Sequence, residues 1–310
     1  MINKKKLSTF FFNDGVILNP EVNKKFMDLN VNQIVKIFEL KGVILFKDFE
    51  IDPKKLTEFT DKFTFRYAND ATRREIKFNN NKINSVDLGT SEMALHSEAS
   101  FSPAWPEIVW FYCVKAPKKS GFTTLCDGIQ LYKNLSLSTK KFFLKNQIIY
   151  KLLIPFKKKA DSNRIFNDAN LIKNTKDWLL EIPGTYNTQI DLKNGFIETE
   201  FKRYAIIESR INGLLSFCNH LLTVFGTDPQ ILECKTANGE KVPEDIYEEI
   251  RAVSKKITYQ IRWNAGELCM IDNKRFLHGR SEILGEEKRE IINIQTLLAN
   301  FGYGATTRSI

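Results

Sequence analysis

The sequence is poor in cysteine, and its cysteines form no pattern. Five are scattered over 310 residues, and none belongs to a Cys-x-x-Cys pair. An odd number without paired spacing argues against a disulfide framework and against a structural zinc site. We expect most of these side chains to be small buried hydrophobic groups. The five are Cys113, Cys126, Cys218, Cys234 and Cys269.

Long hydrophobic runs are also missing. No apolar stretch approaches the roughly 18 residues that a membrane-spanning helix needs. A basic start, Met1 to Lys6, precedes an apolar stretch from Leu7 to Phe12 that is too short for a signal-peptide core. We therefore expect a cytoplasmic protein with no membrane partner.

Acidic residues are outnumbered by basic ones, which gives a net charge of +9. The lysines are spread widely, with small clusters at 4–6 and 157–159, and no helix-turn-helix or zinc-finger spacing accompanies them. This distribution favours a solvated surface over a nucleic-acid interface. An acidic substrate or partner stays open, as does oxidation of nucleic acids, which salt-dependent binding would support.

Apolar residues make up 43% of the chain and include 24 phenylalanines, enough for a large aromatic core. Short strands dominate the predicted elements, so we expect one domain over residues 1–310, mainly β with flanking helices. The lysine- and asparagine-rich residues 155–180 are predicted to be an insertion or lid. The patterns predict helices over 31–40, 53–65, 131–145 and 243–256, and strands over 43–46, 108–114, 257–263, 268–271 and 289–298. Residues 69–92 are polar, with Asn79-Asn80-Asn81 marking a loop or turn, and 188–200 read as a hairpin turning at 193–195.

Only three histidines occur, and two have neighbours that suit a metal site. His96 lies in Leu95-His96-Ser97-Glu98. Side chains alternate along a strand, so His96 and Glu98 would point the same way and could chelate one ion. His278 lies in Leu277-His278-Gly279-Arg280, and Arg289 follows eleven residues later (289 − 278). Two imidazoles and a carboxylate on one face of Fe(II) leave three positions for a cosubstrate and oxygen.

These segments resemble the taurine dioxygenase and clavaminate synthase-like branch of the Fe(II)/2-oxoglutarate oxygenases. The resemblance covers most of the chain and rests on the segment from Asp272-Asn273 to Arg280, followed by Arg289. It also includes the segments Lys41 to Phe46, Leu95 to Phe101 with Trp105-Pro106, and Ser120-Gly121-Phe122-Thr123. It implies a double-stranded β-helix (jelly-roll) core and an enzyme that uses Fe(II), 2-oxoglutarate and O2.

The resemblance assigns roles to particular residues. His96, Glu98 and His278 would be the iron ligands, and Glu98 in place of the usual aspartate is typical of the amino-acid hydroxylase members. Arg289 would bind the far carboxylate of 2-oxoglutarate through a charge-assisted contact, with Thr123 donating its hydroxyl to the same group. Arg280 would contact 2-oxoglutarate or substrate, or hold Glu98. Asp272 and Asn273 are expected to brace the turn before His278.

Substrate identity is the least determined property. Relatives similar around His96 act on amino acids, free or tethered to carrier proteins, so we expect an amino-acid-like substrate and leave an acidic carrier protein open. Candidate substrate residues are Arg73, Arg74 and Asn219, while His220 is expected to be structural. Glu98 occupies the position that is vacated in halogenating relatives, so hydroxylation is favoured. Desaturation, ring closure and a non-catalytic binding protein are the alternatives.

Overall fold

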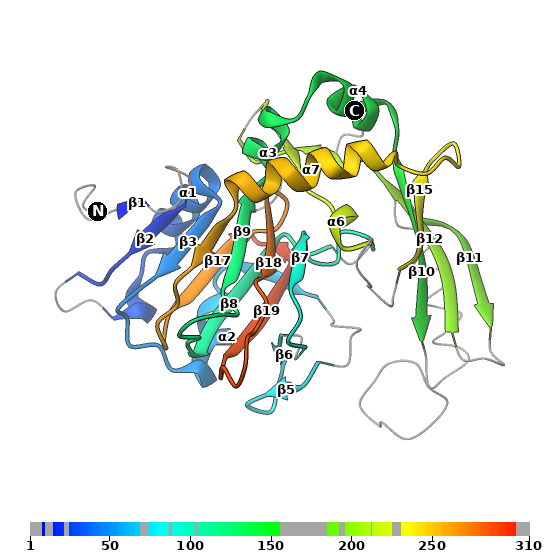
Figure 1. Ribbon diagram of the computed structural model, residues 1–310. Coiled ribbons are helices and arrows are strands. Elements are labelled where there is room, and N and C mark those ends of the chain that lie inside the picture. The colour runs from blue at the N-terminus through cyan, green and yellow to red at the C-terminus, as the bar shows by residue number, and fades with distance from the viewer. Residues whose placement is uncertain are drawn as a thin grey trace.

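Two packed sheets form the centre of the protein in the computed structural model (Figure 1). The model describes residues 8–9, 15–21, 25–68, 74–86, 89–102, 105–155, 185–191, 196–211, 213–224 and 231–301. Within these residues the larger sheet has nine strands, in the order β1 (Ser8–Thr9), β2 (Val16–Leu18), β3 (Val43–Phe46), β17 (Leu268–Asp272), β8 (Ile108–Lys115), β19 (Glu290–Ala299), β6 (Asn80–Ser85) and β5 (Ile76–Lys77), with β4 (Thr64–Tyr67) beside β19. The smaller sheet has the order β16 (Tyr259–Ile261), β9 (Thr123–Asp127), β18 (Phe276–Arg280) and β7 (Met93–His96).

The central strands are almost wholly apolar because both of their faces are buried. On β3, Ile44 and Phe46 join a core beneath the N-terminal helices, while Val43 and Leu45 join a second core between the two sheets. Residue Phe276 of the smaller sheet packs into that second core. The alternation of side chains along a strand therefore serves two cores at once. These sheets confirm the mainly β, jelly-roll architecture.

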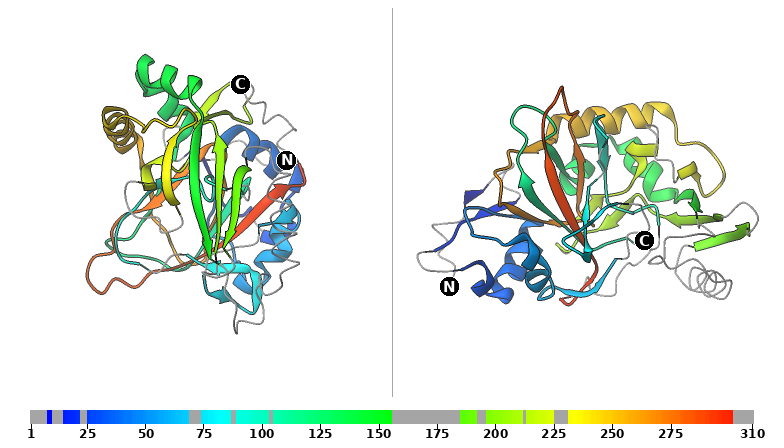
Figure 2. Two further views of the ribbon diagram at one scale, coloured as in Figure 1. Left: turned by 90° about the vertical axis from the view of Figure 1, so that its right-hand side faces the viewer. Right: turned by 90° about the horizontal axis from the view of Figure 1, so that it is seen from below.

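A third sheet stands beside the two central ones, as Figure 2 shows from two further sides. Its strands are β11 (Thr185–Asp191), β12 (Phe196–Arg203), β10 (Ile148–Pro155) and β15 (Ile231–Thr236). Antiparallel pairing of β11 with β12 confirms the predicted hairpin, although its turn, 192–195, lies outside the described residues. So does most of the predicted insertion, from 156 to 180. A short hairpin of β13 (Ile206–Glu208) and β14 (Leu215–Phe217) follows.

The helices flank the sheets. They are η2 (Phe26–Asp28), α1 (Val31–Lys41), η3 (Pro53–Lys55), α2 (Leu56–Thr60), α3 (Gly128–Asn134), α4 (Leu137–Lys145), α6 (Leu221–Val224) and α7 (Glu244–Ile257). The helix α1 has Asn30 as its N-cap and ends at Gly42, whose φ of 72° suits glycine. In the described part of the chain, no helix combines the length and apolar character needed to cross a membrane.

Two predicted helices were wrong in detail, and the predicted turn near Asn79 belongs to a hairpin. The single helix over 131–145 is two helices, because the Ser136 side chain accepts from Thr139 N and starts α4 anew. The helix over 53–65 stops at Thr60, and the chain then enters β4, which pairs with β19. The polar stretch 69–92 contains the hairpin of β5 and β6, whose turn residues Phe78 and Asn79 have φ of 54° and 53°.

Candidate active site

His96 and His278 face each other across two neighbouring strands. They are register partners on β7 and β18, and their ring centroids lie 4.5 Å apart. The Oε2 atom of Glu98 lies 3.6 Å from His96 Nε2 and 3.4 Å from His278 Nε2. All three side chains are buried, with residue exposures of 5%, 9% and 3% in the order His96, Glu98, His278. Their ligand atoms lie within 4.8 Å of one another, an arrangement that can hold one metal ion.

Glu98 reaches this position from a turn, so the prediction that a regular strand carries it was wrong. The strand β7 ends at His96, and Glu98 opens the turn that contains Ala99, whose φ is 50°. The Asn273 side chain takes the place of a strand partner: its Oδ1 accepts from Glu98 N (2.8 Å) and its Nδ2 donates to Glu98 O (3.0 Å). The segment before His278 thus braces the carboxylate loop as well as its own turn.

The two carboxylate oxygens of Glu98 have different surroundings. Gln295 Nε2 donates to Oε1 at 3.1 Å, and Arg74 Nη1 lies 3.1 Å from the same oxygen. The other oxygen, Oε2, is turned toward both imidazoles. Burial by itself would raise the pKa of Glu98, but the Arg74 charge and the two histidines hold that pKa well below its usual range. The carboxylate is therefore ionised and presents one oxygen to an ion.

Sequence reasoning missed Gln295. It lies on β19, the strand that follows Arg289, and side chains two residues apart on a strand share a face. Counting in steps of two from Arg289 reaches 291, 293 and 295, so the polar residues at 293 and 295 were a usable signal. Both are buried, at 1% and 8% exposure. A buried polar side chain on the same face as a predicted ligand-binding arginine points toward the site.

The imidazoles are prepared to offer their Nε2 atoms. His96 Nδ1 lies 2.8 Å from Ala94 O, which places the proton on Nδ1 and leaves the Nε2 lone pair for a ligand bond. Burial and the neighbouring His96 lower the pKa of His278 to about 4, so this ring is neutral near pH 7. For His96, burial alone would lower the pKa, but Glu98 outweighs it and raises the pKa above its usual value.

Arg289, Thr123 and Arg280 gather along the same cavity. Arg289 Nη2 donates to Thr123 Oγ1 at 3.3 Å, and Trp263 Nε1 donates to the same hydroxyl at 2.9 Å. Burial, together with the charge of Arg280, lowers the pKa of Arg289 to about 10, so the guanidinium is still charged at neutral pH. The Arg280 Nη2 atom donates to Ser91 O at 2.6 Å, and Arg280 is the register partner of Thr123.

Close approach of β18 to β7 depends on Gly279. A Cβ atom at this position would lie 2.5 Å from Met93 O and 2.9 Å from Thr124 Oγ1. Only glycine lets the two strands come together between His278 and Arg280. The close approach of the two strands explains why glycine follows His278.

The remaining predicted residues have different surroundings. Arg73 lies outside the described residues, and Arg74 contacts Glu98. The Asn219 amide donates to Ala205 O and accepts from Leu221 N, so both of its ends are bonded within the scaffold. His220 Nδ1 lies 3.2 Å from Ser97 O, and its ring centroid lies 5.0 Å from that of His96.

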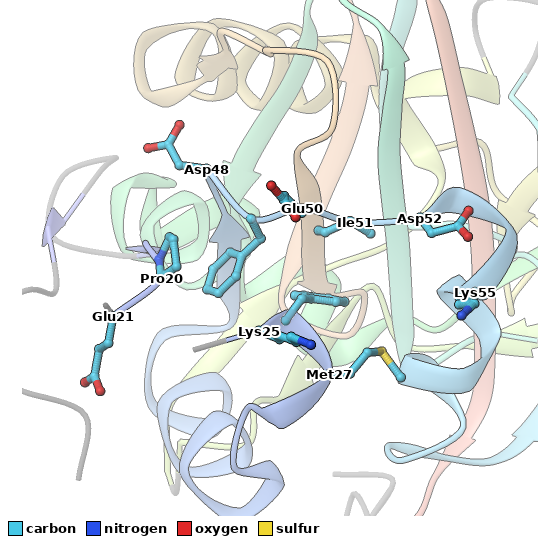
Figure 3. A pocket seen from close by; sticks show the side chains of 11 residues that line it. Pro20, Glu21, Lys25, Met27, Asp48, Glu50, Ile51, Asp52 and Lys55 are labelled. Carbon is cyan, nitrogen blue, oxygen red and sulfur yellow. The ribbon is translucent and has the colours of Figure 1, made fainter. Parts of the chain in front are cut away.

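The cavity at the histidines is small, about 30 Å³, which is room for roughly one water molecule. A larger hollow of about 550 Å³ lies beside η2 and η3 and shares no lining residue with the cavity at the histidines. Its acidic side chains, among them Glu21, Asp48, Glu50 and Asp52, are spread along it rather than gathered at one point (Figure 3). Among the described residues, the one group of three or more potential metal ligands is His96, Glu98 and His278.

Comparison with known proteins agrees with this geometry. Residues 18–295 match the family described as taurine catabolism dioxygenase TauD, TfdA family. The chain belongs to this family. It is therefore a 2-oxoglutarate-dependent oxygenase that uses Fe(II), 2-oxoglutarate and O2, and the alternative of a non-catalytic jelly-roll protein is set aside.

Individual relatives are distant. The chain is 22% identical over 292 residues to the dapdiamide synthesis protein DdaC of Enterobacter agglomerans, covering 82% of each chain. The structure resembles PvcB from Pseudomonas aeruginosa, with 12% identity, a TM-score of 0.61 and coverage of 95% of this chain and 93% of that one. It also resembles a taurine dioxygenase from Burkholderia xenovorans, with 11% identity, a TM-score of 0.60 and coverage of 93% and 88%. At such identities the structural likeness establishes the fold.

Proposed function

We propose that this oxygenase hydroxylates a C–H bond of a small amino-acid-like substrate, releasing succinate and CO2. The observation that supports it most is the convergence of two buried histidines and one ionised carboxylate beside the Arg289–Thr123 pair. DdaC is described as a dapdiamide synthesis protein, and PvcB as an oxygenase from an isonitrile synthetic pathway. Both descriptions place relatives in the biosynthesis of small molecules, which favours a substrate of that class here.

In this proposal His96, Glu98 and His278 hold Fe(II). The donor set fits such an ion: neither ring nitrogen of His278 has a hydrogen-bond partner in the described structure, and its Nε2 faces the Glu98 carboxylate. When bound, iron with 2-oxoglutarate and O2 supplies the oxidising chemistry for an unactivated C–H bond. Glu98 Oε1 is already engaged by Gln295 and Arg74, so Oε2 is the oxygen that would hold the ion.

Arg289 and Thr123 orient the cosubstrate. The guanidinium supplies a charged donor for the far carboxylate of 2-oxoglutarate, and Arg289 Nε has no hydrogen-bond partner in the described part of the protein. Trp263 donates to the Thr123 hydroxyl and so leaves the hydroxyl proton free to point at that carboxylate. Arg280 lies along the same cavity and contacts either the cosubstrate or the substrate. The surrounding apolar side chains Val86, Met93 and Phe111 exclude water from the reacting region.

Three finer features belong to the same proposal. The substrate is either free or attached to an acidic carrier protein, for which the net charge of +9 is favourable. The chain is a single domain over residues 1–310. The enzyme acts in the cytoplasm.

The decisive test is an anaerobic absorption titration with Fe(II) and then 2-oxoglutarate. A visible charge-transfer band that needs both additions supports the iron and cosubstrate sites. Amino acids and carrier-bound amino acids are then screened by the shift they cause in the band. Mass spectrometry of the product distinguishes hydroxylation, which adds one oxygen atom, from desaturation or ring closure, which removes two hydrogens. Folded, iron-loaded protein that shows no band with 2-oxoglutarate would contradict the proposal.

A further inference from the structure

One buried acceptor in the metal cavity is satisfied neither by the protein nor by the iron and cosubstrate. Asn293 lines the same cavity as His96, Glu98 and His278 and is 1% exposed. Its Oδ1 atom has no hydrogen-bond partner in the described structure. Asn293 lies on β19 two residues before Gln295, so both side chains point from the same face of the strand toward the site.

Two other unbonded atoms of this cavity differ in kind from Asn293 Oδ1. His278 Nε2 offers a lone pair to a metal, and Arg289 Nε is a donor that a carboxylate can satisfy. 2-Oxoglutarate at neutral pH carries two carboxylates and a keto oxygen, all of which are acceptors. It cannot donate a hydrogen bond to Asn293 Oδ1. A buried acceptor without a donor is costly, so the donor has to come from the substrate or from a water that the substrate displaces.

The charge of the cavity restricts what kind of donor this is. Iron(II) and the two carboxylates of 2-oxoglutarate cancel each other. The lining then contains three guanidinium groups, Arg74, Arg280 and Arg289, against the single carboxylate of Glu98. The surplus of two positive charges (three minus one) disfavours an ammonium group and favours a substrate that carries an anion. The donor is then a neutral group, and in an amino-acid derivative that keeps its carboxylate an acylated nitrogen supplies one as an amide N–H.

We propose that Asn293 accepts a hydrogen bond from the amide N–H of an N-acylated amino acid whose carboxylate is free. This inference rests on the proposed function and narrows its substrate class from amino-acid-like compounds to their N-acyl derivatives. Asn293 is then a residue that determines specificity, separate from those that hold iron and 2-oxoglutarate.

The test compares matched probes on the anaerobic complex with Fe(II) and 2-oxoglutarate. For each proteinogenic side chain, four compounds are titrated: the N-acetyl amino acid, its N-methyl derivative, the O-acetyl 2-hydroxy acid and the free amino acid. We expect an N-acetyl amino acid to shift the charge-transfer band and to bind about 10-fold or more tightly than its ester and N-methyl counterparts, which lack the donor. Equal binding of the ester, tighter binding of the free amino acid, or no shift from any probe overturns the inference. Absence of the band before any probe is added is a different result, because it contradicts the iron and cosubstrate sites.

Variants connect the preference to Asn293 itself. Asn293→Asp keeps an acceptor oxygen and should retain the preference for the amide over the ester. Asn293→Leu removes the acceptor at similar size, so the amide-to-ester ratio should fall to about one while the band with 2-oxoglutarate persists. Asn84→Leu is the matched control, since Asn84 is the buried register partner of Asn293 on β6 but does not line the cavity. An unchanged ratio in Asn293→Leu overturns the assignment.

Discussion

The protein has two hollows of very different size and character. The hollow beside η2 and η3 measures about 550 Å³, and its carboxylates are dispersed over exposed residues such as Asp48 and Glu50. The cavity at the histidines measures about 30 Å³, yet buried donors and acceptors from four strands and from the turn of Glu98 converge on it. Because water is excluded from the smaller cavity, the charge interactions among its side chains are stronger than those in the larger hollow. Convergence of buried polar groups marks the candidate active site here, whereas volume does not.

The largest loss should come from removing the carboxylate of the small cavity. Glu98→Ala deletes a proposed iron ligand and removes the carboxylate that Arg74 and Gln295 both contact. Because loss of outer-sphere partners already costs about 10- to 100-fold in metal affinity, we expect Fe(II) affinity to fall by more than about 100-fold. Anaerobic Fe(II) titration measures it, with Glu50→Ala in the large hollow as the control. If Glu98→Ala bound Fe(II) as tightly as the wild type, the small cavity would not be the iron site, and the contrast between the two hollows would fail.

Arg289→Met should affect the cosubstrate and spare the metal. The buried guanidinium is a charge-assisted donor, and losing such a bond costs about 1.5 to 3 kcal/mol, or roughly 10- to 100-fold in the Kd of 2-oxoglutarate. Arg289→Lys keeps the charge but loses the planar pair of donors, so its effect should be smaller. The titration of 2-oxoglutarate at saturating Fe(II) gives both values. If Fe(II) affinity falls as much as that of 2-oxoglutarate, Arg289 is a general support of the fold instead.

Gln295→Leu should weaken Fe(II) binding moderately and leave 2-oxoglutarate binding nearly unchanged. The variant removes the 3.1 Å bond to Glu98 Oε1 and frees that oxygen to rotate. We expect Fe(II) affinity to fall about 10-fold with little change in 2-oxoglutarate binding at saturating iron. Gln295→Glu is informative beside it, because it places a second carboxylate against Glu98 and should perturb the site more strongly. Equal Fe(II) affinity in wild type and Gln295→Leu would show that Arg74 alone fixes the carboxylate.

The smallest effect should come from the large hollow. Asp48→Asn with Glu50→Gln neutralises two exposed carboxylates there without changing their shape. We expect stability to change by less than about 0.5 kcal/mol and the charge-transfer band to be unchanged. Thermal unfolding and the Fe(II) and 2-oxoglutarate titrations check both. A changed titration would mean that the two hollows are coupled across the larger sheet.

Much of the site was predictable because its chemistry is concentrated in rare residues. With three histidines in the chain, His96 and His278 could be selected from their neighbours alone, and the structure brings them together with Glu98. Their roles as ligands stay a prediction. Strands β3, β8 and β17 were evident because both of their faces are buried and the whole segment is apolar.

The parts that were missed depend on contacts that are distant in sequence. The turn that carries Glu98 is set by Asn273, a contact that no local pattern reveals. The position of its carboxylate is set by Gln295, whose place on the strand could be read by alternation from Arg289 but whose contact with Glu98 could not. The split between α3 and α4 depends on Ser136, whose hydroxyl also donates to Glu249 on α7. Local periodicity continues through such a break, so the pattern alone extended the helix too far.

The bond between Asn273 and Glu98 joins residues 175 positions apart in the chain. During synthesis, His96 and Glu98 leave the ribosome well before Asn273, His278 and Arg289 exist. A nascent or truncated chain that stops before Asn273 therefore has one of the two histidines proposed to hold iron and an unbraced carboxylate, and it lacks the arginine expected to bind the cosubstrate. The proposed iron and cosubstrate sites are thus complete only in chains that are almost fully made.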